Sequence, residues 1–397
     1  MLADHSVVVA GHICLDIIPD MGGRAQERFE AMFLPGRLIH VGPVTLATGG
    51  PVSNTGLALH KLGIRTQLMG KVGDDMFGQL ICQLVAKYAP YLAEGMVVDS
   101  RVSSSYTLVI SPPDVDRIFL HYPGANDTFS AADIRYDLLT TASLFHFGYP
   151  PLMRLMYEER GAQLVEVYQR ARQTGVTTSL DMAVPDPAAP AGRADWPGIV
   201  RATLPYVDIF LPSIEEILYM IRRATFEELA RDGMGDRFLA KVTPELLSDV
   251  GRELLDMGAK VVGLKLGARG FYVRTAGQAD IQALGRARPS NADSWADQEW
   301  WAPCFKVNMV GAAGSGDSTI AGFLSGLLRG MTLPEALTAA VAVGACNVEA
   351  ADTLSGVRSW DETMQRVAAG WERHELRLSA PGWEFDKQHQ MWRGPAR

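Results

Sequence analysis

Short apolar runs with the composition of β-strands alternate along this chain with longer runs of helical periodicity, and short links join them. Strands connected through helices run parallel, and helices then cover both faces of the sheet that they form. The pattern therefore predicts an α/β fold, a three-layer α/β/α sandwich with a mostly parallel central sheet. The expected strands are 6–11, 65–72, 144–147, 176–181, 209–212 and 260–265, and the expected helices are 53–62, 77–87, 152–174, 214–222, 243–257, 318–328 and 333–350.

Polar residues and glycines follow several of these strands. Ligands of open α/β sheets bind outside the carboxyl ends of the strands. Asp16, Asn54, Ser213 and Gly267 come just after an expected strand or early in the helix that follows it. We therefore expect these four residues to lie along the edge of the sheet where a ligand would bind.

The stretch 307–318 has the pattern of a strand end, a loop of small residues and the start of an apolar helix. Backbone N–H groups and the positive helix terminus converge at such a junction, which suits a phosphate. The spacing Gly311-x4-Gly316 mimics a Walker A loop, but Asp317 stands where that loop has its lysine. This exchange changes the chemistry that the loop can support.

An aspartate repels phosphates unless its task is to take a proton from an attacking hydroxyl. The loop therefore indicates phosphoryl transfer to an alcohol, with Asp317 as the base and Gly314, Ser315 and Gly316 as the anion hole. These residues alone support equally the alternative that Asp317 merely caps a helix beginning at Ser318.

A second block near the amino terminus points to a family. Residues 48–54 read TGGPVSN, a helix ending in Leu-Gly follows, and residues 70–78 read GKVGDDMFG. This order resembles the amino-terminal signature of the PfkB, or ribokinase-like, carbohydrate kinases. The loop 311–317 resembles their carboxy-terminal signature D-T-x-G-A-G-D, with Gly311, Ala312 and Ser315 in place of its first Asp, its Thr and its Ala. The resemblance covers roughly residues 6–360.

The resemblance implies ATP-dependent transfer of the γ-phosphate to a hydroxyl of a small sugar or sugar acid, with Mg2+ and Asp317 as general base; dependence on a monovalent cation is left open. The implied acceptor-binding residues are Asp16, Gly49, Gly50, Asn54 and Asn126, the last within a G-A-N motif. Each has a structural alternative: a strand end for Asp16, turns for the glycines and for the G-A-N motif, and a helix cap for Asn54.

The resemblance also assigns nucleotide and metal contacts. Lys265, Gly267, Gly270 and Gly311 are expected near the phosphates, and Asn347 near the adenine. Ser213 to Glu216 match the family motif N-x-x-E with Ser in place of Asn, so Glu216 is expected to act on Mg2+ through water. The alternative for Lys265 is a strand-end lysine that faces solvent.

The domain expected is one kinase unit, residues 1–370, with a tail at 371–397 that we leave unassigned. Segments 12–47 and 96–130 break the alternation, and the resemblance implies a small β lid over the sugar; the alternative is an antiparallel extension without a ligand role. Residues 273–304 are expected to form a surface insert. Exposed lid edges would invite pairing with another chain, so a homodimer through the lid is a prediction.

Composition excludes several classes. The net charge of −8 argues against a nucleic-acid partner. The four cysteines are scattered without a C-x-x-C pair, which is typical of reduced core residues and not of a disulfide frame or zinc site. No apolar run approaches a membrane span, and the amino terminus lacks a basic leader, so we expect no membrane partner and a cytoplasmic protein.

The acceptor is less closely defined than the reaction. Ribokinases carry lysine after the diglycine, whereas Gly50-Pro51 here is closer to fructokinases and ketodeoxygluconate kinases, and Lys265-Leu266-Gly267 also occurs among the latter. A nucleoside acceptor stays open, because adenosine kinase-like enzymes share the fold. A non-catalytic sugar-binding member is the third alternative, against which the retained Asp317 and loop glycines argue.

Overall fold

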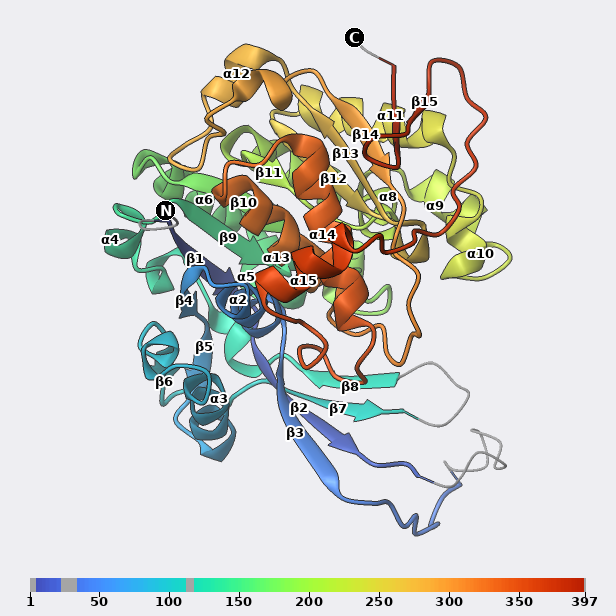
Figure 1. Cartoon of the computed structure of the whole chain (residues 1–397). Helices are drawn as coiled ribbons and strands as arrows, with labels where there is room; N and C mark the ends of the chain where they lie inside the picture. Colours follow the sequence, from blue (N-terminus) through green and yellow to red (C-terminus); the bar gives the residue numbers. More distant parts are fainter. Residues whose placement is uncertain (1–4, 23–33, 112–117, 396–397) are drawn as a thin grey trace.

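The structure, a computed structural model, describes residues 5–22, 34–111 and 118–395. Its main sheet has the strand order β15-β16-β14-β13-β12-β11-β10-β9-β1-β4 and lies in the middle of the molecule (Figure 1). Neighbouring strands from β4 to β12 pair in parallel, and β13, β14, β16 and β15 continue the sheet antiparallel. The α/β class and the mostly parallel sheet are confirmed.

The main-sheet strands are β1 Ser6–Gly11, β4 Arg65–Met69, β9 Leu144–Gly148, β10 Thr177–Asp181, β11 Ile209–Phe210, β12 Val261–Lys265, β13 Phe271–Thr275, β14 Glu299–Ala302, β15 Glu384–Asp386 and β16 Met391–Arg393. The helices that cover it include α2 Pro51–Lys61, α6 Ala162–Gln173, α7 Trp196–Thr203, α8 Ile214–Ile221, α9 Arg223–Ala230, α11 Pro244–Asp256, α13 Ser315–Leu328, α14 Leu333–Asn347 and α15 Trp360–Ala368. The other helices are α3 Met76–Ala86 and the short α4 Tyr136–Leu139, α5 Arg154–Tyr157, α10 Asp236–Leu239 and α12 Gln278–Gln282.

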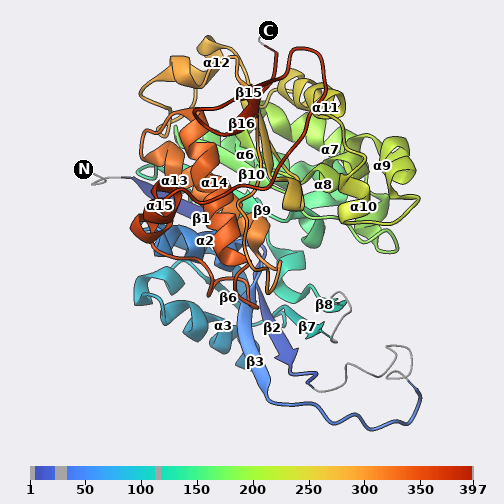
Figure 2. The same ribbon diagram turned by 45° about the vertical axis from the view of Figure 1, so that its right-hand side comes forward.

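Alternate residues of the central strands face two separate hydrophobic cores. In β1, Val7 and Val9 pack with α2, α13 and α14, whereas Val8 and Ala10 pack with α6, α8 and α11 on the other face. This period of two is what a strand buried on both faces produces. The two helix layers are visible on either side of the sheet in Figures 1 and 2.

A second, four-stranded sheet with the order β3-β2-β7-β8 projects below the main body (Figures 1 and 2). Its strands are β2 Cys14–Pro19, β3 Val44–Gly49, β7 Tyr106–Ile110 and β8 Ile118–Tyr122. This sheet is the predicted lid, and we call it the lid below. The short β6 Val97–Asp99 lies outside the lid, because it pairs with β5 Lys71–Gly73. Residues 23–33 and 112–117 of the predicted lid segments lie outside the described residues.

Three predicted elements differ in the structure. The expected helix 152–174 is interrupted before α6, where Glu159, Arg160 and Gly161 have positive φ. Glycine suits position 161, because its φ is 77° and a Cβ there would lie 2.8 Å from Ile199 of α7. The expected strand 65–72 divides at Gly70 into β4 and β5. Asp16 lies inside β2 of the lid and not directly after β1.

The ends of the expected insert 273–304 belong to the main sheet through β13 and β14, and Trp295 and Trp301 are fully buried. The residues between the two strands include α12 and are mostly exposed or half-buried. The unassigned tail extends the same sheet through β16, which pairs with β14. Sequence alternation missed both, because these strands are short and pair antiparallel without an intervening long helix. None of the helices in the described ranges is long and apolar enough to cross a membrane.

Candidate active site

Asp317 lies in the first turn of α13 and is only 2% exposed. Its Oδ2 accepts hydrogen bonds from Asn54 Nδ2 at 3.1 Å and from the Tyr149 hydroxyl at 2.9 Å, and its Oδ1 accepts one from Thr55 Oγ1 at 3.0 Å. The helix begins at Ser315 and its N-cap is Gly314, so the alternative in which Asp317 caps a helix from Ser318 is wrong. The carboxylate is instead buried and accepts hydrogen bonds from three side chains of other elements.

The loop before α13 gives this carboxylate its surroundings. Gly314 has φ 71°, and a Cβ there would lie 2.6 Å from the carbonyl oxygen of Thr353. The first N–H groups of a helix have no partner within it. The N–H of Ser315 donates to Ala312 O at 3.3 Å, so the N–H groups of Gly316 and Asp317 begin the anion-attracting terminus. The geometry therefore keeps the loop residues that the sequence assigned to the anion hole next to Asp317.

Burial raises the pKa of Asp317 above that of an ordinary aspartate. The positive charge of Lys265 and the hydrogen bonds from Asn54, Tyr149 and Thr55 oppose this effect, because they stabilise the ionised form. The carboxylate thus combines proton affinity above that of a free aspartate with an environment that tolerates its charge.

A second group of charges lies beside the loop. Lys265 Nζ forms an ion pair with Asp181 and lies 3.9 Å from Glu216 Oε2. The three residues come from the carboxyl ends of β12 and β10 and from the first turn of α8, which follows β11. The stem of Lys265 passes Gly316 so closely that a Cβ there would lie 3.3 Å from Lys265 Cδ. Lys265 is therefore not the solvent-facing lysine of the alternative interpretation; it connects the strand ends to the loop.

Burial lowers the pKa of Lys265, but the carboxylates of Asp181 and Glu216 more than offset that effect, so its pKa lies above the usual value and the amine stays charged. Ser213 and Glu216 form a capping box at the start of α8, with Ser213 N–H donating to Glu216 Oε2 at 2.6 Å. Glu216 thus has a structural task besides any role toward Mg2+. The Ser at position 213 preserves the cap.

The two glycines expected at the acceptor site make room for polar side chains. A Cβ at Gly49 would lie 2.5 Å from Asp16 Oδ2, and a Cβ at Gly50 would lie 2.5 Å from His12 Nδ1. Gly50, with φ 89°, is the N-cap of α2. Asn54 therefore does not cap this helix, and the diglycine lets Asp16 and His12 approach the start of α2.

Two predicted asparagines have structural partners. Asn126 is fully buried, and its amide both donates to the backbone oxygen of Ile13 at 2.9 Å and accepts from the Ile13 N–H at 3.2 Å. Asn347 Nδ2 donates to Ala313 O at 2.8 Å, and this bond connects the end of α14 to the loop 311–314. These bonds give both residues a positioning task, and their ligand roles stay predictions.

The remaining glycines, which were expected at the nucleotide site, shape backbone turns. Gly267 and Gly270 flank a short 3-10 turn after β12, with φ 53° and 100°. No side chain fits at Gly270, because a Cβ would overlap the carbonyl oxygen of Ala302. The N–H of Gly311 donates to Val348 O at 3.2 Å. All three lie on loops at the same end of the sheet as Lys265, where the sequence placed them.

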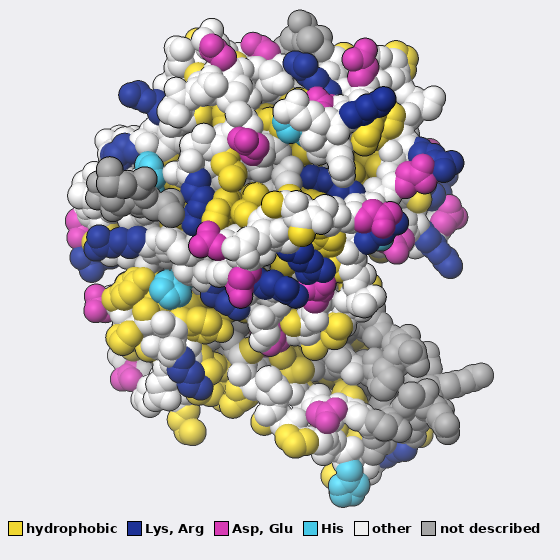
Figure 3. Space-filling model, viewed as in Figure 1, with side chains coloured by type: hydrophobic (Ala, Val, Ile, Leu, Met, Phe, Trp, Pro, Cys, Tyr) yellow, Lys and Arg dark blue, Asp and Glu magenta, His cyan; other side chains and the backbone are white. Residues whose placement is uncertain are grey.

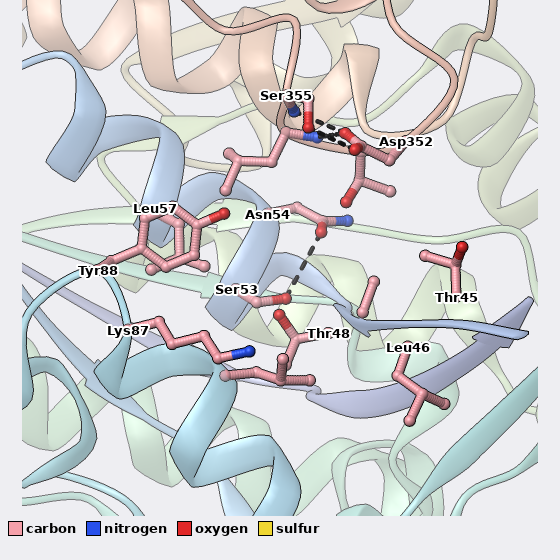
Figure 4. A pocket seen from close by; sticks show the side chains of 14 residues that line it. Thr45, Leu46, Thr48, Ser53, Asn54, Leu57, Lys87, Tyr88, Asp352 and Ser355 are labelled. Atoms are coloured by element: carbon pink, nitrogen blue, oxygen red, sulfur yellow. Dashed lines mark hydrogen bonds between the residues drawn. The ribbon is translucent and has the colours of Figure 1, made fainter.

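A cavity of about 410 Å³ lies between lid strand β3, the helices α2 and α3, and the loop around Asp352 (Figure 4). Asn54 points into it, with Ser53 and Asp352 nearby, and Lys87 reaches in from the opposite side. Neither Asp16 nor Asp317 lines this cavity. It therefore borders the active site only at Asn54.

Sequence reasoning missed three residues at this site. Thr55 and Tyr149 bind Asp317 directly, and Asp181 pairs with Lys265. Asp181 ends an apolar strand that the sequence did delimit, so its position was a usable signal. The sequence around Tyr149 carried no such signal, because the position of this side chain depends on a left-handed backbone conformation with φ 64°.

The arrangement is that of an α/β protein with a mostly parallel sheet and a separate lid, and ligands of such sheets bind beyond the carboxyl ends of the strands. Residues 4–360 match the pfkB family of carbohydrate kinases, and the chain belongs to that family. The family and fold that the two signatures indicated are thus confirmed.

Individual relatives are distant. Fructokinase-2 of Oryza sativa subsp. japonica is 28% identical over 196 residues, which are 49% of this chain and about half, 54%, of that protein's length. The 2-dehydro-3-deoxygluconokinase of Bacillus subtilis (strain 168) is 24% identical over 357 residues, 86% of this chain and 92% of that protein. The structure of a putative ribokinase II from E. coli in complex with ATP and Mg2+ is 18% identical and superposes with a TM-score of 0.65. The match covers 92% of this chain and 99% of that chain, and it shows the shared fold.

Proposed function

We propose that this protein transfers the γ-phosphate of ATP to a hydroxyl of a small ketose or 2-keto-3-deoxy sugar acid. The observation that carries the proposal is Asp317, buried at the start of α13, held by three donors and adjacent to the charged Lys265. The names of the relatives, fructokinase-2 and 2-dehydro-3-deoxygluconokinase, favour these acceptors. A coupled ADP-release assay over sugars, keto acids and nucleosides tests it, and turnover with nucleosides alone would overturn the acceptor assignment.

The hydrogen bonds around Asp317 suggest how it would act. An ionised carboxylate has about four acceptor positions, and three are in use here, two on Oδ2 and one on Oδ1. Oδ1 therefore has the spare capacity to accept the acceptor hydroxyl and then its proton. The N–H groups of the Gly314–Gly316 turn would stabilise the charge that develops on the transferred group. Lys265 would neutralise phosphate oxygens from the other side.

The residues fit ATP with Mg2+. Mg2+ takes one or two protein carboxylates and keeps several waters. Asp181 and Glu216 lie on either side of Lys265, and Asp181 Oδ2 is buried without a hydrogen-bond partner in the described part of the chain. These two carboxylates would hold the ion, directly or through water, and the ion would neutralise charge on the phosphates. Gly267, Gly270, Gly311 and Asn347 are the proposed nucleotide-side residues, and a monovalent cation stays a prediction.

Asp16 is the proposed anchor for the acceptor, together with Gly49, Gly50, Asn54 and Asn126. We expect Asp16→Ala to raise the KM for the acceptor by about 10- to 100-fold and the KM for ATP little, because each polar group left unpaired costs ~1–3 kcal/mol. Initial rates with each substrate varied in turn measure this. Equal increases in both constants would contradict an acceptor role, and Asp20→Ala farther along the lid is the control.

Tyr149 should set the pH dependence. Its hydroxyl donates to ionised Asp317, so Tyr149→Phe removes one stabilising bond and raises the Asp317 pKa further. A bond to a charged group is worth ~1.5–3 kcal/mol, so we expect the acidic limb of the kcat/KM profile to move up by about 1–2 pH units. Tyr91→Phe, a surface hydroxyl that contacts His60, is the control. If the acidic limb does not move, the group that titrates there is not Asp317.

The lid offers an apolar surface for a second copy of the chain, and we propose a homodimer through it. Leu38, Val44, Phe119 and Leu120 are all more than half exposed there, and apolar side chains are visible on the lid in Figure 3. Such surfaces and open strand edges favour association. We expect a dimer mass by light scattering at micromolar concentration, lost in Phe119→Lys but kept in Met234→Lys, an exposed site between α9 and α10. A monomeric wild type would reject the dimer.

A further inference from the structure

Two histidines and a cysteine, far apart in sequence, converge where the lid joins the body. His12 lies between β1 and β2, Cys14 begins β2, and His121 lies in β8 on the far side of β7. One ligand atom from each lies within 4.8 Å of the others. Among the described residues, they are the group of His, Cys, Asp and Glu side chains with this spacing for a metal ion. We call them the His–Cys cluster.

The distances suit a tetrahedral ion. The Nε2 atoms of His12 and His121 face each other at 3.3 Å. Two nitrogens bound at ~2.0–2.1 Å to one tetrahedral Zn2+ lie about 3.3 Å apart. A thiolate at ~2.3 Å from the same ion lies about 3.6 Å from each nitrogen. Cys14 Sγ lies within 4.8 Å of a ring nitrogen of each histidine, so the sulfur would move closer to them on binding.

The surroundings orient these ligand atoms. Thr107 Oγ1 lies 3.0 Å from His121 Nδ1 and 3.4 Å from Cys14 Sγ. With His121 Nδ1–H donating to Thr107, the Nε2 lone pair of His121 turns toward the gap. The Cys14 thiol donates to Asp16 Oδ1 at 3.3 Å, and a bound metal ion would replace that proton. Metal-binding histidines commonly have such a partner on the other ring nitrogen. Thr107 is thus placed to support two ligands at once.

The His12 ring is buried, and its polar contact is with His121. Its Nδ1 faces Gly50 and has no hydrogen-bond partner in the described ranges, which leaves His121 as the polar contact of the ring. Two ring nitrogens that face each other at 3.3 Å hold either a proton or a cation between them.

We propose that His12, Cys14 and His121 bind one Zn2+ or a similar borderline-soft divalent cation, which ties the outer lid strand β8 to the body. Nitrogen and sulfur ligands select this class of ion, whereas Mg2+ requires oxygen ligands. Three protein ligands leave a fourth position for water. The alternative occupant is a proton, in an N–H···N bond between the rings.

The test uses the full chain, stripped with a chelator and kept reduced, without ATP or acceptor, so its result does not depend on the proposed activity. Co2+ is titrated first, and we expect one equivalent to produce the thiolate-to-cobalt charge-transfer band, which Zn2+ removes and excess Mg2+ does not. In Cys14→Ser the band should vanish. Zn2+ affinity should fall by at least ~10²-fold in Cys14→Ser and His121→Gln, and by ~10–100-fold in Thr107→Val.

Cys82→Ser is the matched control, since Cys82 is a half-buried free thiol on α3 outside the cluster. It should keep the band and the affinity. Hydrogen exchange provides a second measurement: Zn2+ should slow exchange in 118–122 of the wild type and not in His121→Gln. Wild-type Zn2+ affinity equal to that of both Cys14→Ser and His121→Gln, or a charge-transfer band that persists in Cys14→Ser, would overturn the proposal and leave the proton as occupant.

Discussion

Asp317→Asn is expected to lower kcat by ~10² to 10⁴, the usual contribution of a general base. The amide cannot take the proton from the acceptor hydroxyl, but it has nearly the same shape. The fold should survive, although three donors now point at a neutral group whose NH2 end cannot accept from them. Steady-state rates with the acceptor found in the substrate panel, and ATP binding by calorimetry, measure the two effects.

Asp249→Asn is the control for this change, because Asp249 lies on α11 with its side chain 57% exposed and its partner, Arg252, is also at the surface. It should keep wild-type turnover. If Asp317→Asn also keeps near wild-type turnover while Asp16→Ala loses acceptor affinity, the protein is a kinase whose base lies elsewhere. If neither variant changes turnover, the whole assignment of the site is wrong.

The sequence predicted most of the sheet, because strands buried on both faces and their following helices each leave a clear period. The resemblance to the PfkB family placed Lys265 with Asp317, Gly314 and Gly316, and the sheet topology agrees with it, because loops after parallel strands share one end of the sheet. The prediction from sequence failed at 273–304, where β14 pairs antiparallel with β13 after a long connection. Local periodicity carries no information about such a pairing.

The partners of the site residues were harder to predict than the residues themselves. Asn54 was expected to bind the acceptor. In the structure its amide, on α2, donates to Asp317 on α13, and the two residues are 263 positions apart in the chain. The His–Cys cluster shows the same limit: Cys14 and His121 are brought together only by the β2-β7-β8 order of the lid. The sequence analysis predicted no zinc site because the cysteines form no C-x-x-C pair, and cysteine spacing carries no information about a histidine that the fold brings close.

The largest stability effect should follow from removing the charge of Lys265. Its ion pair with Asp181 is buried, with side-chain exposures of 12% and 0%. Burial raises the pKa of Asp181 well above the usual aspartate value, and Lys265 opposes this effect. In Lys265→Met the Asp181 carboxyl therefore either stays an uncompensated charge beside Glu216 or takes up a proton, and breaking a buried pair in this way costs up to ~3–5 kcal/mol. We expect the free energy of unfolding, measured with urea in the absence of ATP, to fall by about that amount.

The double variant Lys265→Met with Asp181→Asn distinguishes the lost charge balance from lost packing. It removes the uncompensated carboxylate, so it should be more stable than Lys265→Met alone and recover part of the loss. Lys306→Met breaks a surface pair with Glu372 and should cost at most ~1 kcal/mol. A double variant that is no more stable than Lys265→Met would mean that the loss comes from the packing of the lysine stem against Gly316, and not from the buried charges.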